Sequence, residues 1–236
     1  MMKKLTTLFA SLLLAVAVVA PASAQSNKSV ERVRRPVNLA VLIQDDLVSR
    51  VGNELRVTAD FIRGLPEGSN VMVGYIRSGS LQVRQPFTSD LAAAARALRI
   101  PVGSTSASPY NPYVQVREAI KLFPAGSAGR NALLLVSDGL DTSRGFDYSS
   151  TVDSIDLNRA VREAKSRGVS VYSFYAPTAG LTSWNGSAVS LGQSALQRVS
   201  DETGGRAFFQ GDSFVTFDAY FTRLAKTLNE QSGRAY

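Results

Sequence analysis

The sequence has no cysteine and no histidine among its 236 residues. Without histidine, a Ser-His-Asp or Cys-His nucleophile pair, an imidazole general base and an HExxH zinc site are excluded. Without cysteine, the chain has no disulfide, no thiolate nucleophile and no Cys-ligated zinc. Any metal must therefore be held by carboxylate, hydroxyl, carbonyl and water oxygens, which favours Mg²⁺, Ca²⁺ or Mn²⁺.

Motifs for nucleotides, acyl transfer and nucleic acids are also missing. The sequence contains no G-x-x-x-x-G-K-[ST] and no G-x-S-x-G, and no G-x-G-x-x-G follows the first predicted strand. Lys and Arg outnumber Asp and Glu by 26 to 19, but the basic residues are scattered apart from a cluster at 28–35, so no nucleic-acid partner is expected. A hydrolase using Asp45 and Asp138 as a carboxylate pair is the least favoured alternative, because no deep sugar cleft is indicated.

The N-terminus has the three-part pattern of a secretory signal peptide. A basic start at 1–4 precedes an apolar stretch at 5–20, and Ala22 and Ala24 supply the small residues of a cleavage site. We expect residues 1–24 to be removed, so that the mature protein begins at Gln25 and is periplasmic or secreted. Membrane contact is expected only through the uncleaved signal peptide. Residues 25–36 are predicted to be a flexible basic leader, and 231–236 a C-terminal tail.

Residues 37–230 are predicted to form one domain of alternating strands and helices. β-rich apolar runs predict strands at 37–43, 71–76, 80–87, 132–136, 169–175 and 206–209, with a hairpin at 77–79. Apolar positions at helical spacing predict helices at 48–65, 90–98, 112–123, 157–167, 193–203 and 217–228. This pattern predicts an α/β fold: a doubly wound, mostly parallel central sheet with one antiparallel edge strand and helices on both faces.

Acidic residues follow two strands that are neighbours in the commonest doubly wound order. Asp45 and Asp46 follow the first strand, and Asp138 follows the strand at 132–136, where we expect a solvent-reaching end. In such sheets, ligands bind beyond the carboxyl ends of the strands. A Ser-rich loop at 103–108 is predicted to lie over the same place. A divalent-cation site is one interpretation, and ordinary turn chemistry is the other.

Several motifs resemble, in order, those of the von Willebrand factor A-type (VWA) domain, in particular those of exported bacterial VWA-related proteins. They include Val41-Leu42-Ile43-Gln44-Asp45, Leu134 to Thr142, and Asp201-Glu202-Thr203-Gly204-Gly205-Arg206. The resemblance covers residues 36–230. It implies a non-enzymatic binding or adhesion module that engages a protein or other macromolecule of the envelope or cell exterior through its carboxyl-edge loops. The alternative is a metal-free envelope scaffold with a vestigial cation site.

The resemblance also implies a metal-ion-dependent adhesion site, for which the family uses D-x-S-x-S, a loop Thr and a later Asp. The matching positions here are Asp45, Ser49, Thr105 and Asp138, with Asp46 as an additional candidate ligand. Leu47 stands where the family has a serine, so the site is degenerate and one hydroxyl ligand is lost. Mg²⁺, Mn²⁺ or Ca²⁺ is the expected ion, and Leu47→Ser is predicted to strengthen its binding.

Trp184 is the single tryptophan of the chain and lies in a predicted loop at 177–191. Two interpretations are open for it. An exposed aromatic side chain on such a loop is a candidate anchor for a binding partner. Equally, the ring can fold back over the domain.

Overall fold

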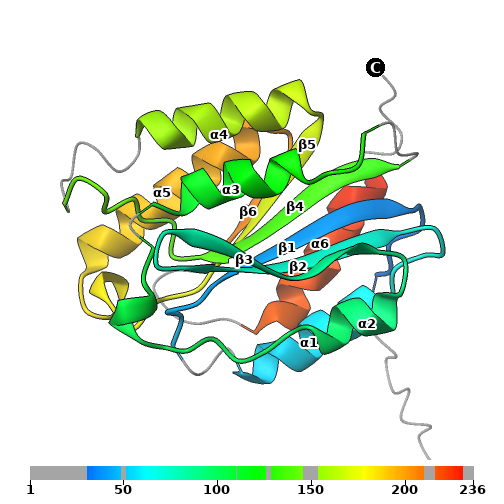
Figure 1. The fold of residues 1–236 in the computed structure, drawn as a ribbon, viewed down its shortest axis with the longest axis horizontal. Helices are drawn as coiled ribbons and strands as arrows, with labels where there is room; N and C mark the ends of the chain where they lie inside the picture. The colour runs from blue at the N-terminus through cyan, green and yellow to red at the C-terminus, as the bar shows by residue number, and fades with distance from the viewer. Residues whose placement is uncertain are drawn as a thin grey trace, which may run out of the picture.

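The computed structural model describes residues 31–48, 52–109, 111–125, 129–145, 154–209 and 216–230. Within them, six strands form one sheet in the order β3-β2-β1-β4-β5-β6. Neighbouring strands are parallel except for β2 and β3, so the predicted sheet with one antiparallel edge strand is confirmed (Figure 1). The strands are β1 (Val37–Gln44), β2 (Asn70–Arg77), β3 (Ser80–Thr88), β4 (Arg130–Ser137), β5 (Val169–Tyr175) and β6 (Ala207–Phe208).

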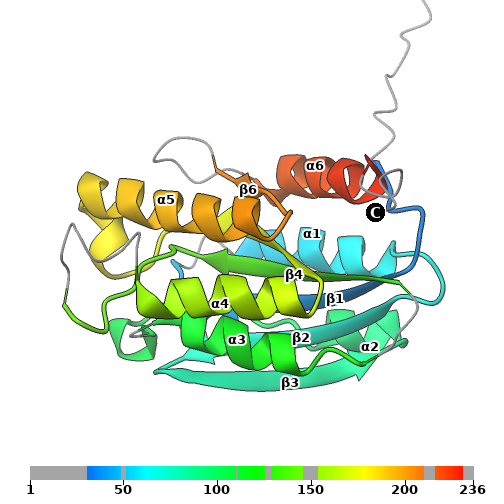
Figure 2. The same cartoon turned by 90° about the horizontal axis from the view of Figure 1, so that it is seen from above.

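Helices cover both faces of the sheet (Figures 1 and 2). One face carries α1 (Gly52–Arg63), α2 (Leu91–Arg96) and α6 (Phe217–Glu230). The other carries α3 (Pro112–Lys121), α4 (Ile155–Ser166) and α5 (Gly186–Glu202). Two short 3₁₀ helices, η2 (Thr105–Ala107) and η3 (Leu181–Ser183), lie in the connecting loops. Among the described helices, none is long and apolar enough to cross a membrane.

The central strand β1 contributes to both hydrophobic layers. Leu39 and Val41 pack into the cluster on the α1 and α6 side, whereas Ala40 and Leu42 pack into the cluster under α3, α4 and α5. A strand buried on both faces needs apolar residues at consecutive positions, which explains the nearly continuous apolar run at 37–43.

The hairpin between β2 and β3 turns through two residues with positive φ, Ser78 at 48° and Gly79 at 72°. Two positive φ values in a two-residue loop give the turn whose twist matches that of the flanking strands. The Ser78 N–H donates to the Ala107 carbonyl over 3.2 Å, so the turn is bonded to η2. The hairpin thereby fixes the position of the Ser-rich loop.

Two boundaries differ from the predictions in ways that bear on the packing. Helix α5 begins at Gly186 rather than near residue 193, because the Asn185 side chain accepts from the Ala188 N–H over 3.1 Å and caps the helix. The leader predicted at 25–36 is packed at its end, since Val33 is buried in the core and Asn229 of α6 donates to the Arg32 carbonyl over 2.9 Å. The signal peptide, residues 25–30 and the predicted tail at 231–236 lie outside the described residues.

Candidate functional site

The predicted acidic residues meet at the carboxyl ends of the two central strands. β1 and β4 are parallel neighbours, with Ile43 opposite Val136, so Asp45 and Asp138 leave the sheet at the same edge. The chain then continues to α1 on one face and toward α4 on the other, which makes this edge a topological switch point. It lies on the left in Figures 1 and 2.

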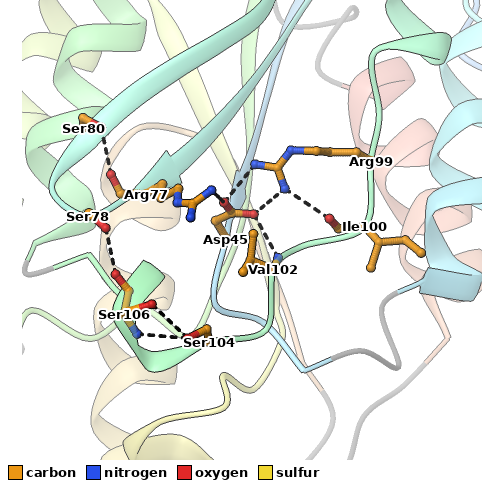
Figure 3. Close-up of polar contacts among 9 residues, drawn as sticks. All are labelled: Asp45, Arg77, Ser78, Ser80, Arg99, Ile100, Val102, Ser104 and Ser106. Carbon is orange, nitrogen blue, oxygen red and sulfur yellow. Dashed lines mark hydrogen bonds and ion pairs between the residues drawn. The ribbon is translucent and has the colours of Figure 1, made fainter.

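The Asp45 carboxylate is fully buried and forms a bidentate ion pair with Arg99. Arg99 Nη1 lies 2.6 Å from Oδ1, and Nη2 lies 2.8 Å from Oδ2. The Val102 N–H donates to Oδ1 over 3.2 Å, and Arg77 Nη1 lies 3.7 Å from Oδ2. Figure 3 shows the two guanidinium groups approaching Asp45 from different sides. Charge-assisted, bidentate contacts of this kind are the strongest hydrogen bonds in proteins.

Arg99 is itself held in place by β2. Its guanidinium carbon lies 4.1 Å from the centroid of the Tyr75 ring, a cation–π arrangement. The Tyr75 hydroxyl donates to the Arg99 carbonyl and accepts from the Arg99 N–H, both over 2.7 Å. The hydrogen bonds to Asp45 raise the pKa of Arg99. The guanidinium is therefore oriented by the fold itself.

Asp138 is surrounded by neutral donors instead of cations. Its Oδ2 accepts from Thr178 Oγ1 over 3.1 Å and from Thr182 Oγ1 over 3.2 Å. Its Oδ1 accepts from Gln44 Nε2 over 3.3 Å and from the Leu140 N–H over 3.1 Å. Burial, and secondarily the charge of Asp46, raise its pKa from 3.8 to about 6. The expectation of a solvent-reaching position was wrong, because the loop after β5 covers this carboxylate.

Asp46 is buried beside these groups and has one unsatisfied oxygen. Its Oδ1 has no hydrogen-bond partner in the described structure. Burial is the main cause of its raised pKa, and the charge of Asp45 adds to it. Its backbone carbonyl accepts from the Ala179 N–H over 2.9 Å, while the Val48 N–H donates to the Pro177 carbonyl over 3.1 Å. The loop after β5 is thus bonded to the segment that follows β1.

Leu47 and Thr105 have surroundings different from those of the buried carboxylates. Leu47 is completely buried and belongs to the hydrophobic cluster on the α1 and α6 side. Thr105 is exposed on η2. The structure brings together Asp45, Asp46 and Asp138, and Ser49 lies outside the described residues.

The end of β4 is fixed by close backbone packing against α5. A Cβ atom on Gly192 of α5 would lie 2.0 Å from the Asp138 carbonyl oxygen, so only glycine permits this approach. Gly139 has a φ of +78°, and the Tyr113 hydroxyl donates to its carbonyl over 2.8 Å. Asp138 is therefore held on a rigid segment.

As arranged, these residues do not fit a cation on Asp45. Its two oxygens face Arg99, and its other contacts, Val102 and Arg77, are also donors. A hard cation instead requires about six oxygen ligands. In the part of the chain that the structure describes, no group of three acidic side chains is placed to hold a metal.

Five side chains that contact Asp45 or Asp138 were not predicted as site residues: Gln44, Arg77, Arg99, Thr178 and Thr182. Arg77 ends β2 and Thr178 follows β5, so the rule that found Asp45 at the carboxyl edge applies equally to them. Arg99 carries no comparable signal, because it follows a helix and reaches Asp45 only through the path of a loop.

Neither a protein-family model nor a curated protein matches this sequence. Solved structures share its fold. BatB from Bacteroides thetaiotaomicron is 12% identical with a TM-score of 0.56, covering 84% of this chain and 100% of that one. An aerotolerance-related membrane protein from Bacteroides fragilis is 13% identical with a TM-score of 0.55, covering 82% and 99%. Mussel proximal thread matrix protein 1, with a zinc-occupied MIDAS motif, is 11% identical with a TM-score of 0.50, covering 86% and 49%.

These likenesses concern the fold. Together with the sheet order, they show that this chain has the VWA-like α/β fold that its motifs predicted.

Proposed function

We propose that this chain is an exported, non-enzymatic VWA-type module that binds a protein through the loops at the carboxyl edge of its sheet. The observation that carries this proposal is the position of exposed apolar side chains. Six large hydrophobic side chains are exposed in the described residues, and four of them lie on segments at this edge: Ile100, Val102, Ile155 and Trp184.

Contacts place these four residues at the edge. Val102 is bonded to Asp45 through its N–H, and Ile100 lies two residues before it. Ile155 begins α4, where Asp156 accepts from Asn111 at the start of α3. Trp184, which is 73% exposed, connects η3 to α5. Single exposed apolar residues are common, but several on the edge where ligands bind favour an interface, with the tryptophan as its anchor.

The charge at this edge favours an acidic partner segment. Arg99 already neutralises Asp45 through two short contacts. Arg77 adds a second positive charge next to the same carboxylate, and its side chain is 41% exposed. A partner carboxylate would pair with the exposed side of Arg77, and charge complementarity of this kind speeds association and helps to select the partner.

The contacts of the Asp45 and Asp138 carboxylates support a non-enzymatic role. Asp45 is held by two guanidinium groups, and Asp138 accepts four hydrogen bonds from within the protein. A general base needs an oxygen within hydrogen-bond reach of the substrate proton. Neither carboxylate offers one in this arrangement, which disfavours the hydrolase alternative.

Site-specific photo-cross-linking in the exporting cell tests the proposal. A cross-linking amino acid at position 184 is expected to capture a protein partner, whereas the same group at Leu122 is not. Leu122 is a matched control because it is also exposed and ends α3 at the opposite edge of the sheet. Arg77→Gln should lower the yield at position 184, and Arg56→Gln on exposed α1 should not. Equal capture at positions 184 and 122 would contradict the proposal.

A second candidate function is cation binding at Asp46, next to Asp138. The observation that favours it is the buried, unpartnered Oδ1 of Asp46, whose charge contributes to the raised pKa of Asp138. Calorimetry with Mg²⁺, Ca²⁺ and Mn²⁺ tests it, with Asp46→Asn as the variant expected to lose the heat of binding. Absence of both partner capture and cation binding would favour the metal-free scaffold.

A further inference from the structure

The surroundings of Asp45 have the wrong polarity for a metal ion. A cation site gathers oxygen atoms, which carry negative charge and point lone pairs at the metal ion. The groups in contact with the Asp45 carboxylate are instead N–H groups of Arg99, Arg77 and the Val102 backbone. The Asp45 side chain is fully buried, so water does not replace any of these contacts.

Arg99 has the features of a built-in counter-ion. Its planar fork matches both carboxylate oxygens, at 2.6 and 2.8 Å, and a third hydrogen bond joins Nη1 to the Ile100 carbonyl over 3.1 Å. Tyr75 holds both its backbone and its guanidinium plane. The guanidinium therefore forms these contacts without a ligand or partner to position it.

The segment after Asp45 is consistent with such a replacement. The Leu47 side chain brings no oxygen to this edge and contributes to the hydrophobic core instead. The Asp45 carbonyl accepts from the Gly103 N–H over 3.1 Å, so the loop that carries Arg99 is bonded to the backbone here as well. The same loop thus supplies both a positive charge and a structural link.

We infer that the Arg99 guanidinium takes the place of a cation on Asp45, so that a permanent positive charge pairs with this carboxylate and the loops at this edge are ordered without a metal. If the proposed function holds, partner capture at position 184 will persist in EDTA. The inference about Asp45 does not depend on that function, because it can be tested with a metal ion alone.

The test is a Mn²⁺ titration of the protein purified from the exported fraction, followed by calorimetry and thermal melting. The wild type is expected to show no Mn²⁺ binding that depends on Asp45. Arg99→Met is expected to gain Mn²⁺ binding and a Mn²⁺-dependent rise in Tm, and to lose both when Asp45→Asn is added. Arg56→Met is the matched control, since Arg56 forms only an exposed ion pair with Asp60, and it should gain nothing.

Two results would overturn the inference. One is Mn²⁺ binding by the wild type that disappears in Asp45→Asn, since Asp45 would then hold a cation with Arg99 present. The other is a folded Arg99→Met variant that gains no Asp45-dependent binding. Should that variant fail to fold, Arg99→Gln keeps a polar donor and releases one oxygen of Asp45, and the same gain is expected of it.

A cation at the second candidate site can be told apart in the same experiment. Wild-type Mn²⁺ binding that is lost in Asp46→Asn but retained in Asp45→Asn supports the inference, because Asp45 is then not a ligand. Failure of the cross-linking experiment would refute the proposed function and leave the Mn²⁺ result unaffected.

Discussion

Asp45 and Asp138 end neighbouring strands at the same edge of the sheet, yet their surroundings are opposite. Asp45 is matched by two guanidinium groups. Asp138 is matched by two hydroxyls, an amide and a backbone N–H, and its pKa rises to about 6. A buried carboxylate that has a cationic partner can stay charged. One that has only neutral donors bears an uncompensated desolvation penalty and tends to hold a proton.

The largest expected effect comes from breaking the ion pair of Asp45. Arg99→Met should lower the free energy of unfolding by about 3–5 kcal/mol, because a fully buried charge loses its main partner. Asp45→Asn should have a smaller effect, since the Arg99 side chain is 24% exposed and can be solvated. Urea unfolding measures the stability of both variants. Arg56→Met is the control, and its free energy of unfolding is expected to lie within about 0.5 kcal/mol of the wild type. An Arg99 effect no larger than the Arg56 effect would show that the pair does not stabilise the fold.

Leu47→Ser is expected to destabilise the protein by about 3 kcal/mol, because it removes buried apolar volume and buries a hydroxyl. Leu47 is completely buried, which argues for this loss of stability, whereas the strengthening of cation binding by the same substitution stays a prediction. Leu122→Ser, at an exposed position, is the matched control and should change little. A cation-dependent rise in the Tm of Leu47→Ser alone would confirm the sequence-based prediction.

Asp138→Asn is expected to change the pH dependence of stability. The folded pKa of Asp138, about 6, lies above its ordinary value of 3.8, so the native state binds this proton more tightly than the unfolded state. The stabilisation that comes from binding this proton is therefore complete below about pH 3.8 and is lost as the pH rises to about 6. Relative to Asp138→Asn, the wild type should lose about 2–3 kcal/mol over this interval.

Urea unfolding of both proteins at several pH values measures this difference, and pH effects of other groups cancel between them. A difference that stays constant from pH 3.5 to 7 would mean that folding does not raise the pKa of Asp138.

The smallest effect on stability is expected for Trp184→Ala. The side chain is 73% exposed, so its removal should change the free energy of unfolding by less than about 0.5 kcal/mol. The same substitution should nevertheless weaken partner capture, monitored by a cross-linking group at Val102. A large loss of stability would indicate that the ring supports the fold, and not an interface.

Much of the architecture could be predicted from the sequence because it depends on local patterns. The apolar run at 37–43 predicted a strand buried on both faces, and residues 77–79 between two β-rich runs predicted the hairpin. The preferred strand order then placed Asp45 and Asp138 at one edge, and β1 and β4 are indeed neighbours. The start of α5 was missed, although Asn185 was available as a cap.

What the carboxylates contact was decided by tertiary structure. Arg99 lies 54 residues from Asp45 and reaches it along a loop whose course no periodicity encodes. Thr178 and Thr182 reach Asp138 from another loop, after β5. Leu47 occupies a motif position, but the direction of the backbone after β1 turns its side chain into the core. The sequence determines where strands end, because a buried strand shows as a local run of apolar residues that stops at polar ones. Which charged groups contact each strand end depends on how distant loops pack around it.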